Sequence, residues 1–237
     1  RDGERTVCGQ ELQGVGAFES LDALTPHWAR ALRAAAAFNA ESDILKRGVG
    51  VAACWYGCGN TSLPNPSTVR VGFTVEGRLK LHQGATDIGQ GSNTVVTQIC
   101  ADAIGLPLAE FELIGPDTAL SPDCGKTSAS RQTYVTGKAA ELAGRALRAS
   151  ALRLANMGED ARLRLEGGRL IASDARGERE ISLSALPLDE RGYALSAEES
   201  YDPPTAPLDE DGQGAPYAVY GYGAQMAELE VDRELGP

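Results

Sequence analysis

Several features that mark common classes of protein are scarce or missing in this chain of 237 residues. Basic residues are outnumbered, with 22 Lys and Arg against 33 Asp and Glu, and the net charge is −11. An acidic chain is a poor non-specific partner for nucleic acid or an anionic membrane surface. No apolar run approaches the roughly 18 residues of a membrane helix, and the polar start, residues 1–5, has no signal-peptide core behind it. We expect a soluble, cytoplasmic protein with no nucleic-acid or membrane partner.

Cysteine and histidine are also few. The odd number of five cysteines is not typical of a secreted disulfide framework. Cys54 and Cys58 form a C-x3-C pair that invites a zinc interpretation, but there is no second pair, and His27 and His82 lie at unrelated spacings. We therefore expect buried reduced thiols and no metal site, with metal binding by the cysteine pair as the alternative.

The apolar patterns that are present predict alternating strands and helices. In the first half of the chain we expect a helix that starts at Thr25-Pro26, with Trp28, Leu32 and Ala36 on one face, followed by a buried strand over 48–55, a loop over 57–67, a hairpin over 68–83 and a helix that ends at Gly105. The second half is expected to contain a strand over 111–114, a long helix from 127 to about 155, a hairpin over 162–172 and a short half-buried segment over 181–186. An acidic loop over 196–214 and closing strands over 217–223 and 226–232 are expected to follow. This order predicts an α+β fold in which mixed and antiparallel sheets pack with two long helices.

A glycine-rich turn, residues 84–93, joins the second strand of the predicted hairpin to the next helix. Gly89 and Gly91 carry no Cβ, so the backbone can take positive φ there and let a ligand approach closely. The first N–H groups of the following helix have no intrahelical partner, and they favour a phosphate or another anion. The alternative is an ordinary turn with Ser92 as the N-cap.

A similar arrangement opens the long helix. Ser128 and Ser130 supply hydroxyls, Gln132 supplies an amide, and the guanidinium of Arg131 suits phosphate, with Lys126 as a further charge. If both turns precede helices at one edge of a sheet, they could grip a single extended anionic ligand. The alternative is that the serines only cap the helix, Arg131 is solvated, and the chain is a non-catalytic structural or interaction domain.

Four sequence blocks resemble, in order and spacing, the molybdopterin-binding subunit of the xanthine dehydrogenase and aldehyde oxidoreductase family. They are 46–51 (KRGVGV), 84–91 (GATDIGQG), 127–137 (TSASRQTYVTG) and 220–232 (YGYGAQMAELEVD). The resemblance implies that residues 46–237 form part of a molybdopterin-binding domain and that residues 1–45 are a helical or irregular lead-in.

The resemblance also implies roles for individual residues. Ile88, Gly89 and Gln90 match the segment that hydrogen-bonds the pterin near its phosphate, and Ala129 and Ser130 match a second cofactor segment. The Ser130-Arg131-Gln132 variant is similar to bacterial members that use the cytosine dinucleotide form, in which Arg131 could serve the pyrophosphate. The expected cofactor-binding residues are Ile88, Gly89, Gln90, Gly91, Ser128, Ala129, Ser130, Arg131 and Gln132.

Members of this family oxidise an aldehyde or N-heterocycle with oxygen derived from water, and they pass electrons through iron–sulfur centres, commonly to a flavin. In this family the catalytic glutamate lies in a later segment, downstream of the part that this chain resembles. Glu228 and Glu230 fit surface positions of a strand and are not candidates for that role. We therefore assign no catalytic and no metal-binding residue. We expect the natural protein to continue beyond residue 237, this chain alone to be inactive, the rest of the subunit and iron–sulfur and FAD domains or subunits to be its partners, and its substrate to be a small molecule.

Overall fold

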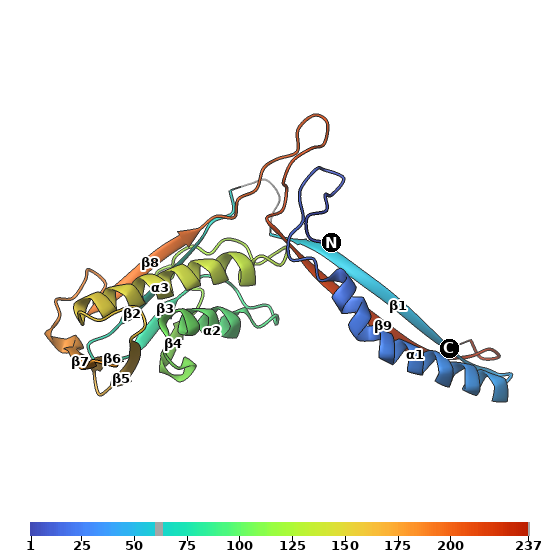
Figure 1. Cartoon of the computed structure of the whole chain (residues 1–237), viewed down its shortest axis with the longest axis horizontal. Coiled ribbons are helices and arrows are strands. Elements are labelled where there is room, and N and C mark those ends of the chain that lie inside the picture. The colour runs from blue at the N-terminus through green and yellow to red at the C-terminus, as the bar shows by residue number, and fades with distance from the viewer. Residues whose placement is uncertain (60–63, 237) are drawn as a thin grey trace. The chain divides into compact units, whose positions relative to one another are not determined.

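The computed structural model describes residues 1–59 and 64–236, and its chain divides into two compact units, Arg1–Ser62 with Thr205–Pro237 and Leu63–Pro204. The expected α+β class is confirmed, with helices packed on antiparallel and mixed sheets (Figure 1). No helix in the part of the chain that the structure describes is long and apolar enough to cross a membrane.

A two-stranded antiparallel ribbon forms the first unit. Strand β1 (Leu45–Cys58) pairs along its whole length with β9 (Val219–Asp232), and the helix α1 (Ala17–Glu41) packs on both strands. Helix α1 contacts the ribbon, and residues 1–45 belong to the same compact unit as β1 and β9. The two closing strands expected over 217–223 and 226–232 are one continuous strand.

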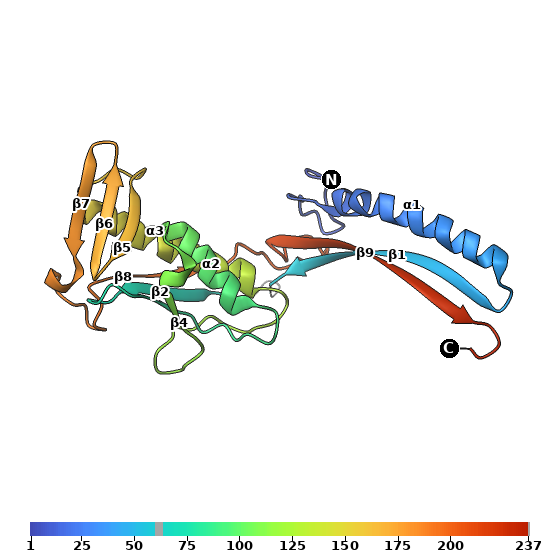
Figure 2. The ribbon, with the colours of Figure 1, turned by 90° about the horizontal axis from the view of Figure 1, so that it is seen from below.

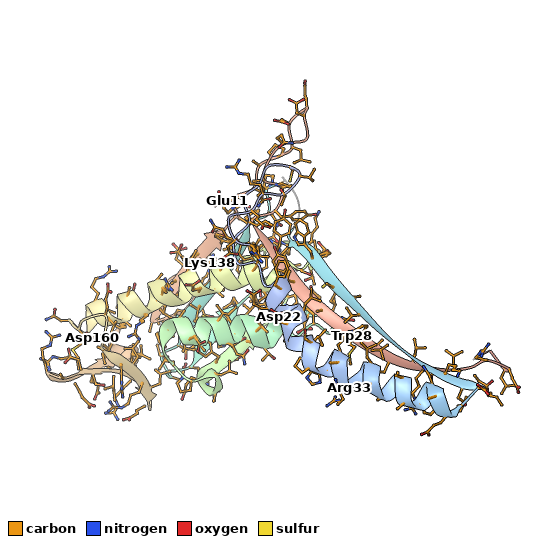
Figure 3. All side chains as sticks on the ribbon, turned by 45° about the vertical axis from the view of Figure 1, so that its right-hand side comes forward. Glu11, Asp22, Trp28, Arg33, Lys138 and Asp160 are labelled. Carbon is orange, nitrogen blue, oxygen red and sulfur yellow. The ribbon has the colours of Figure 1, made fainter. Side chains whose placement is uncertain are left out.

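Helix α1 begins eight residues before the predicted start, and Pro26 lies inside it. A proline inside a helix removes one backbone hydrogen bond, so the packing of a small-residue face must stabilise this helix. That face carries the buried Ala31 and Ala35, while Leu32, which was expected there, is 43% exposed. In Figure 3 the half-buried Trp28 lies on the β9 side of α1.

Strand β1 does not have the burial that its composition predicts. Its apolar, glycine-containing run is typical of a strand covered on both faces, yet every residue from 50 to 56 is exposed, and Trp55 retains 55% of its accessible surface. The reason is that α1 is the only helix in the described part of this unit. The predicted 57–67 loop is also shorter, because β1 runs to Cys58 and the next strand starts at Ser67, and residues 60–63 lie outside the described residues.

The second unit contains a four-stranded sheet in the order β4-β3-β2-β8. The predicted hairpin is confirmed as β2 (Ser67–Phe73) and β3 (Leu79–His82), and the strand predicted over 111–114 is β4 (Phe111–Ile114), which runs parallel to β3. Helices α2 (Ser92–Ile104) and α3 (Gly137–Leu154) pack together on one face of this sheet (Figure 2). As predicted, α2 ends at Gly105, which takes the left-handed conformation with φ +81.

Strand β8 (Leu195–Tyr201) was predicted to be part of an acidic loop but pairs with the whole of β2. One of its two glutamates, Glu198, is paired with basic side chains and accepts hydrogen bonds from Arg70 at 2.6 Å and Arg191 at 2.8 Å. These partners are distant in the sequence, so local composition does not reveal the strand.

A three-stranded antiparallel sheet, β5 (Arg162–Glu166), β6 (Arg169–Asp174) and β7 (Gly177–Ser182), completes the unit. The predicted hairpin is β5 and β6, and the segment expected over 181–186 is the end of β7 followed by a single 3-10 turn, Leu183–Ala185. One apolar core joins both sheets and the two helices, with Phe73, Leu81, Val96, Leu147 and Leu170 fully buried. This core fixes the ends of α2 and α3 from which the candidate site is built.

Candidate functional site

The loops that precede α2 and α3 meet at one end of the second unit (Figure 1). The hydroxyl of Thr127 donates a hydrogen bond to the carbonyl oxygen of Thr86 at 2.8 Å, which ties the two loops together. Beside this link lies an open hollow of about 360 Å³ that both loops line. Its lining residues are Ile88, Gln90, Thr127, Ser128, Ala129, Ser130, Arg131, Gln132 and Thr133.

Most of the residues predicted to bind a cofactor therefore come together. Gln90 and Ser130, which are 40 positions apart in the sequence, line the same hollow. Gly89 and Gly91 do not line it, although both take the positive φ that the sequence predicts, +103 and +81. Their effect on the hollow is thus indirect, through the path of the turn.

The second loop has an unusual backbone. Ala129 and Ser130 both occupy the left-handed region, with φ of 51 and 55, which is costly for a residue with a Cβ. The helix that was predicted to start at 127 starts only after them, first as a π-helical turn, Gln132–Thr136, and then as α3. Because the chain turns here, the N–H groups of Ser128, Ala129 and Ser130 find no acceptor among the described residues.

The first loop is organised by a residue that the sequence analysis missed. The carboxylate of Asp87 accepts hydrogen bonds from the N–H groups of Gly89 at 2.9 Å, Gly91 at 3.3 Å and Asn93 at 3.1 Å. These bonds hold the pKa of Asp87 below its usual value, the one from Gly89 most strongly. The start of α2, where a bound anion was expected, thus already holds an anion of the chain itself.

This arrangement also decides against Ser92 as the N-cap, which was the alternative interpretation of the turn. Gly91, in the left-handed conformation, is the N-cap of α2, and Ser92 is buried in the first turn. The capping role of Asp87 does have a signal in the sequence, since an aspartate two residues before a glycine is typical of a turn in which the aspartate side chain accepts hydrogen bonds from the backbone.

Gln90 braces the first loop from the rim of the hollow. Its Oε1 accepts from the N–H of Ile88 at 2.7 Å, and its Nε2 donates to the hydroxyl of Ser92 at 3.1 Å and, more weakly, to Thr86 O at 3.3 Å. The side chain remains exposed. An incoming ligand can therefore reach this amide.

Gln132 has a comparable role in the second loop, although it is buried. Its Nε2 donates to Lys126 O and to the hydroxyl of Thr127, both at 3.1 Å, and its Oε1 accepts from Thr136. These bonds fix Thr127, which in turn holds the first loop. Thr127 is a second residue that the sequence analysis did not include among the binding residues.

Arg131 differs most from its predicted role. It was expected to offer its guanidinium to a phosphate, but the residue is fully buried. Nη1 donates to the carbonyl oxygens of Cys124 and Lys126, and Nη2 donates to those of Asn65 at 2.9 Å and Pro66 at 3.0 Å. The fork is thus used inside the protein, and the two-pronged phosphate contact that was predicted is not available.

The hollow is suited to an anionic ligand in an acidic chain. None of its lining residues is Asp or Glu, two of its serines are exposed, and three N–H groups lack an acceptor in the described chain. Within residues 1–59 and 64–236, no group of three His, Cys, Asp or Glu side chains could hold a metal ion. The expectation of buried thiols holds only for Cys100 and Cys124, because Cys54 is exposed and Cys8 and Cys58 are partly exposed.

Comparison with known proteins identifies the family. A family model described as the molybdopterin cofactor-binding domain matches residues 23–237. The chain belongs to the molybdopterin cofactor-binding domain family. This result confirms the resemblance drawn from the four sequence blocks.

Individual relatives of this molybdopterin cofactor-binding domain are several times longer. The chain is 30% identical over 250 residues to the xanthine dehydrogenase molybdenum-binding subunit of Escherichia coli O157:H7, covering 99% of this chain and 31% of that protein. It is 26% identical to the aldehyde oxidoreductase of Megalodesulfovibrio gigas, covering all of this chain and 24% of that protein. The solved aldehyde oxidoreductase of Desulfovibrio desulfuricans has the same fold, with a TM-score of 0.75 at 24% identity over 98% of this chain and 23% of its own.

Proposed function

We propose that the hollow between the two loops holds the phosphate-bearing tail of a molybdopterin cofactor. The observation that carries this proposal is the convergence of Gln90 and Ser130 on one hollow from two separate loops. The ligand would be held by the amide of Gln90, the hydroxyls of Ser128 and Ser130, and the free N–H groups of residues 128–130. Backbone N–H groups and hydroxyls are good donors to phosphate oxygens.

The strained turn supports this assignment. Left-handed residues other than glycine are concentrated at binding sites, where the surrounding structure holds them in place. Here the bonds of Gln132 and the link from Thr127 to Thr86 hold the turn in its conformation before any ligand arrives. A preformed cradle of this kind binds more tightly because less chain must be ordered on binding.

The wider role that we propose is that of part of a molybdenum hydroxylase. The bound cofactor supplies the redox chemistry by which an aldehyde or N-heterocycle is oxidised with water-derived oxygen, and this chain's residues grip and orient it. Because the chain spans 31% of the Escherichia coli relative, we propose that the catalytic glutamate, the substrate pocket and the iron–sulfur and flavin centres belong to other segments or subunits.

We propose the cytosine dinucleotide as the form of the cofactor. With Arg131 buried, the support for this form is the Ser130-Arg131-Gln132 sequence together with the open end of the hollow, in which a second phosphate has donors from Ser128 to Ser130. The nucleotide itself would extend beyond the two loops.

The test is to produce the chain in a bacterium that makes molybdenum cofactor and to measure pterin, molybdenum and released CMP per chain. A Gln90→Ala variant should retain at least about tenfold less pterin after dialysis, since one hydrogen bond to a charged group contributes about 1.5–3 kcal/mol. The matched control is Gln98→Ala, an exposed glutamine of α2 outside the hollow, which should retain pterin like the parent chain.

Two results would refute the proposal. One is a folded parent chain without pterin from cells whose own molybdenum hydroxylases are filled. The other is equal pterin retention by the Gln90 and Gln98 variants. Pterin without CMP would refute only the dinucleotide form.

A further inference from the structure

The buried Arg131 carries a charge that the protein does not pair directly. No carboxylate of the described residues lies within ion-pair distance of its guanidinium, which instead contacts four carbonyl oxygens. Its Nε is buried and finds no hydrogen-bond partner among residues 1–59 and 64–236. Burying a charge without a counter-charge is unfavourable, and such charges in proteins are normally balanced nearby.

The surroundings balance this charge only in part. Asp123 and Asp202 attract it from a distance, while their own carboxylates accept hydrogen bonds from the N–H groups of Gly125 at 2.7 Å and Asn65 at 2.9 Å. Burial outweighs both and lowers the pKa of Arg131. The cation thus favours additional negative charge close to it.

Gly125 shows how closely the backbone fits around this guanidinium. A Cβ at this position would lie 2.7 Å from Nη1 and 2.9 Å from Nη2 of Arg131, and the backbone φ is +66. The guanidinium therefore lies directly against the loop that leads into the strained turn, and Arg131 itself is one of the residues that line the hollow.

We infer that Arg131 is the internal counter-charge of the anion site, and that it acts on the bound phosphate through the Ala129–Ser130 turn without contacting it. This inference rests on the proposed function, because it requires an anion in the hollow. Arg131 is thus a positioning residue: its fork fixes the loop, and its charge, in a region of low dielectric constant, favours the ligand.

A second arginine of the chain provides a matched control. Arg148 also clamps backbone carbonyls, with Nη1 bound to Ile104 O at 2.8 Å and Nη2 bound to Glu159 O at 3.0 Å and Ala161 O at 2.6 Å. It lies near the opposite end of α3 and does not line the hollow. Its loss should therefore affect stability without affecting an anion in the hollow.

The experiment is titration calorimetry of the 237-residue chain with inorganic pyrophosphate, for the parent and for Arg131→Gln, Arg131→Lys and Arg148→Gln, each checked for folding by circular dichroism. We expect the dissociation constant to rise at least tenfold in Arg131→Gln and to be unchanged in Arg148→Gln. Lysine loses the fork but keeps the positive charge, and the inference assigns the effect on the ligand to that charge, so the dissociation constant of Arg131→Lys should stay within about threefold of the parent value.

Equal affinity of the parent and a folded Arg131→Gln for pyrophosphate would overturn the inference. A tenfold loss of affinity in a folded Arg131→Lys would also overturn it, because the effect would then depend on the fork alone and not on the charge. If Arg131→Gln does not fold, Arg131→Lys decides by the same limits. Failure of the parent itself to bind pyrophosphate would count against the proposed function, and the two failures are thereby distinguished.

Discussion

The strain in the Ala129–Ser130 turn can be measured by removing it. At φ 51, replacing Ala129 by glycine should relieve about 1–2 kcal/mol of backbone strain in the folded state. Glycine also raises the conformational entropy of the unfolded chain, which should lower the free energy of unfolding by about 0.4–1 kcal/mol. Ala129→Gly is therefore expected to stabilise the chain by about 0.5–1 kcal/mol, or to raise Tm by about 3 °C for a unit of this size.

The control is the same substitution in a regular helix. Ala149 is an exposed residue of α3, and Ala149→Gly should destabilise the chain by about 0.5–1 kcal/mol. The two variants should thus move Tm in opposite directions in a calorimetric scan. If both lowered Tm equally, the left-handed conformation of Ala129 would not be a source of strain and the reasoning would be wrong.

The affinity of Ala129→Gly for a ligand should fall although its stability rises. Glycine adopts both hands of the backbone, so the turn in Ala129→Gly is less preformed and should bind pyrophosphate several-fold more weakly in spite of its higher Tm. An unchanged affinity would show that the turn is held by its surroundings alone.

Two further predictions concern the core of the second unit. Burial lowers the pKa of His82 below the ordinary 6.5, so the folded state favours its neutral form. The free energy of unfolding should therefore be fully retained above pH 6.5 and fall as the pH drops below it. His82→Gln should flatten this dependence in urea unfolding from pH 5 to 8. A Cβ on Gly144 would lie 2.8 Å from that of Ala103 and 3.0 Å from Cys100 O, so Gly144→Ala should lower the free energy of unfolding by about 1–2 kcal/mol, and a gain in stability would contradict the close packing of α2 on α3.

The sequence predicts well the features that depend on neighbouring residues. Alternation predicts β2 and β3, a short mostly apolar run predicts β4, and Gly105 ends α2 where a left-handed glycine is required. The convergence of Gln90 and Ser130 also follows, because it needs only two loops that precede helices on the same sheet.

The sequence predicts poorly the features that depend on distant partners. The guanidinium of Arg131 donates its hydrogen bonds to backbone carbonyls up to 66 positions away instead of to water. No local sequence pattern indicates that this arginine is buried. Strand β8 contains Glu198, whose partner Arg70 lies 128 positions earlier in the sequence, so the residues around β8 do not by themselves indicate a strand. Asp87 is different, since its short-range turn signature was present in the sequence and was overlooked.

The ribbon of β1 and β9 has a practical consequence for anyone who purifies the chain. Within the described parts of the chain, its two strands have only each other as sheet partners. The stretch from Val51 to Tyr56 has no charged residue. A long, apolar strand edge without charges is a template on which another copy can add a strand. Preparations are therefore expected to scatter more light as the protein concentration rises, and a lysine in place of Ala53 should suppress that self-association.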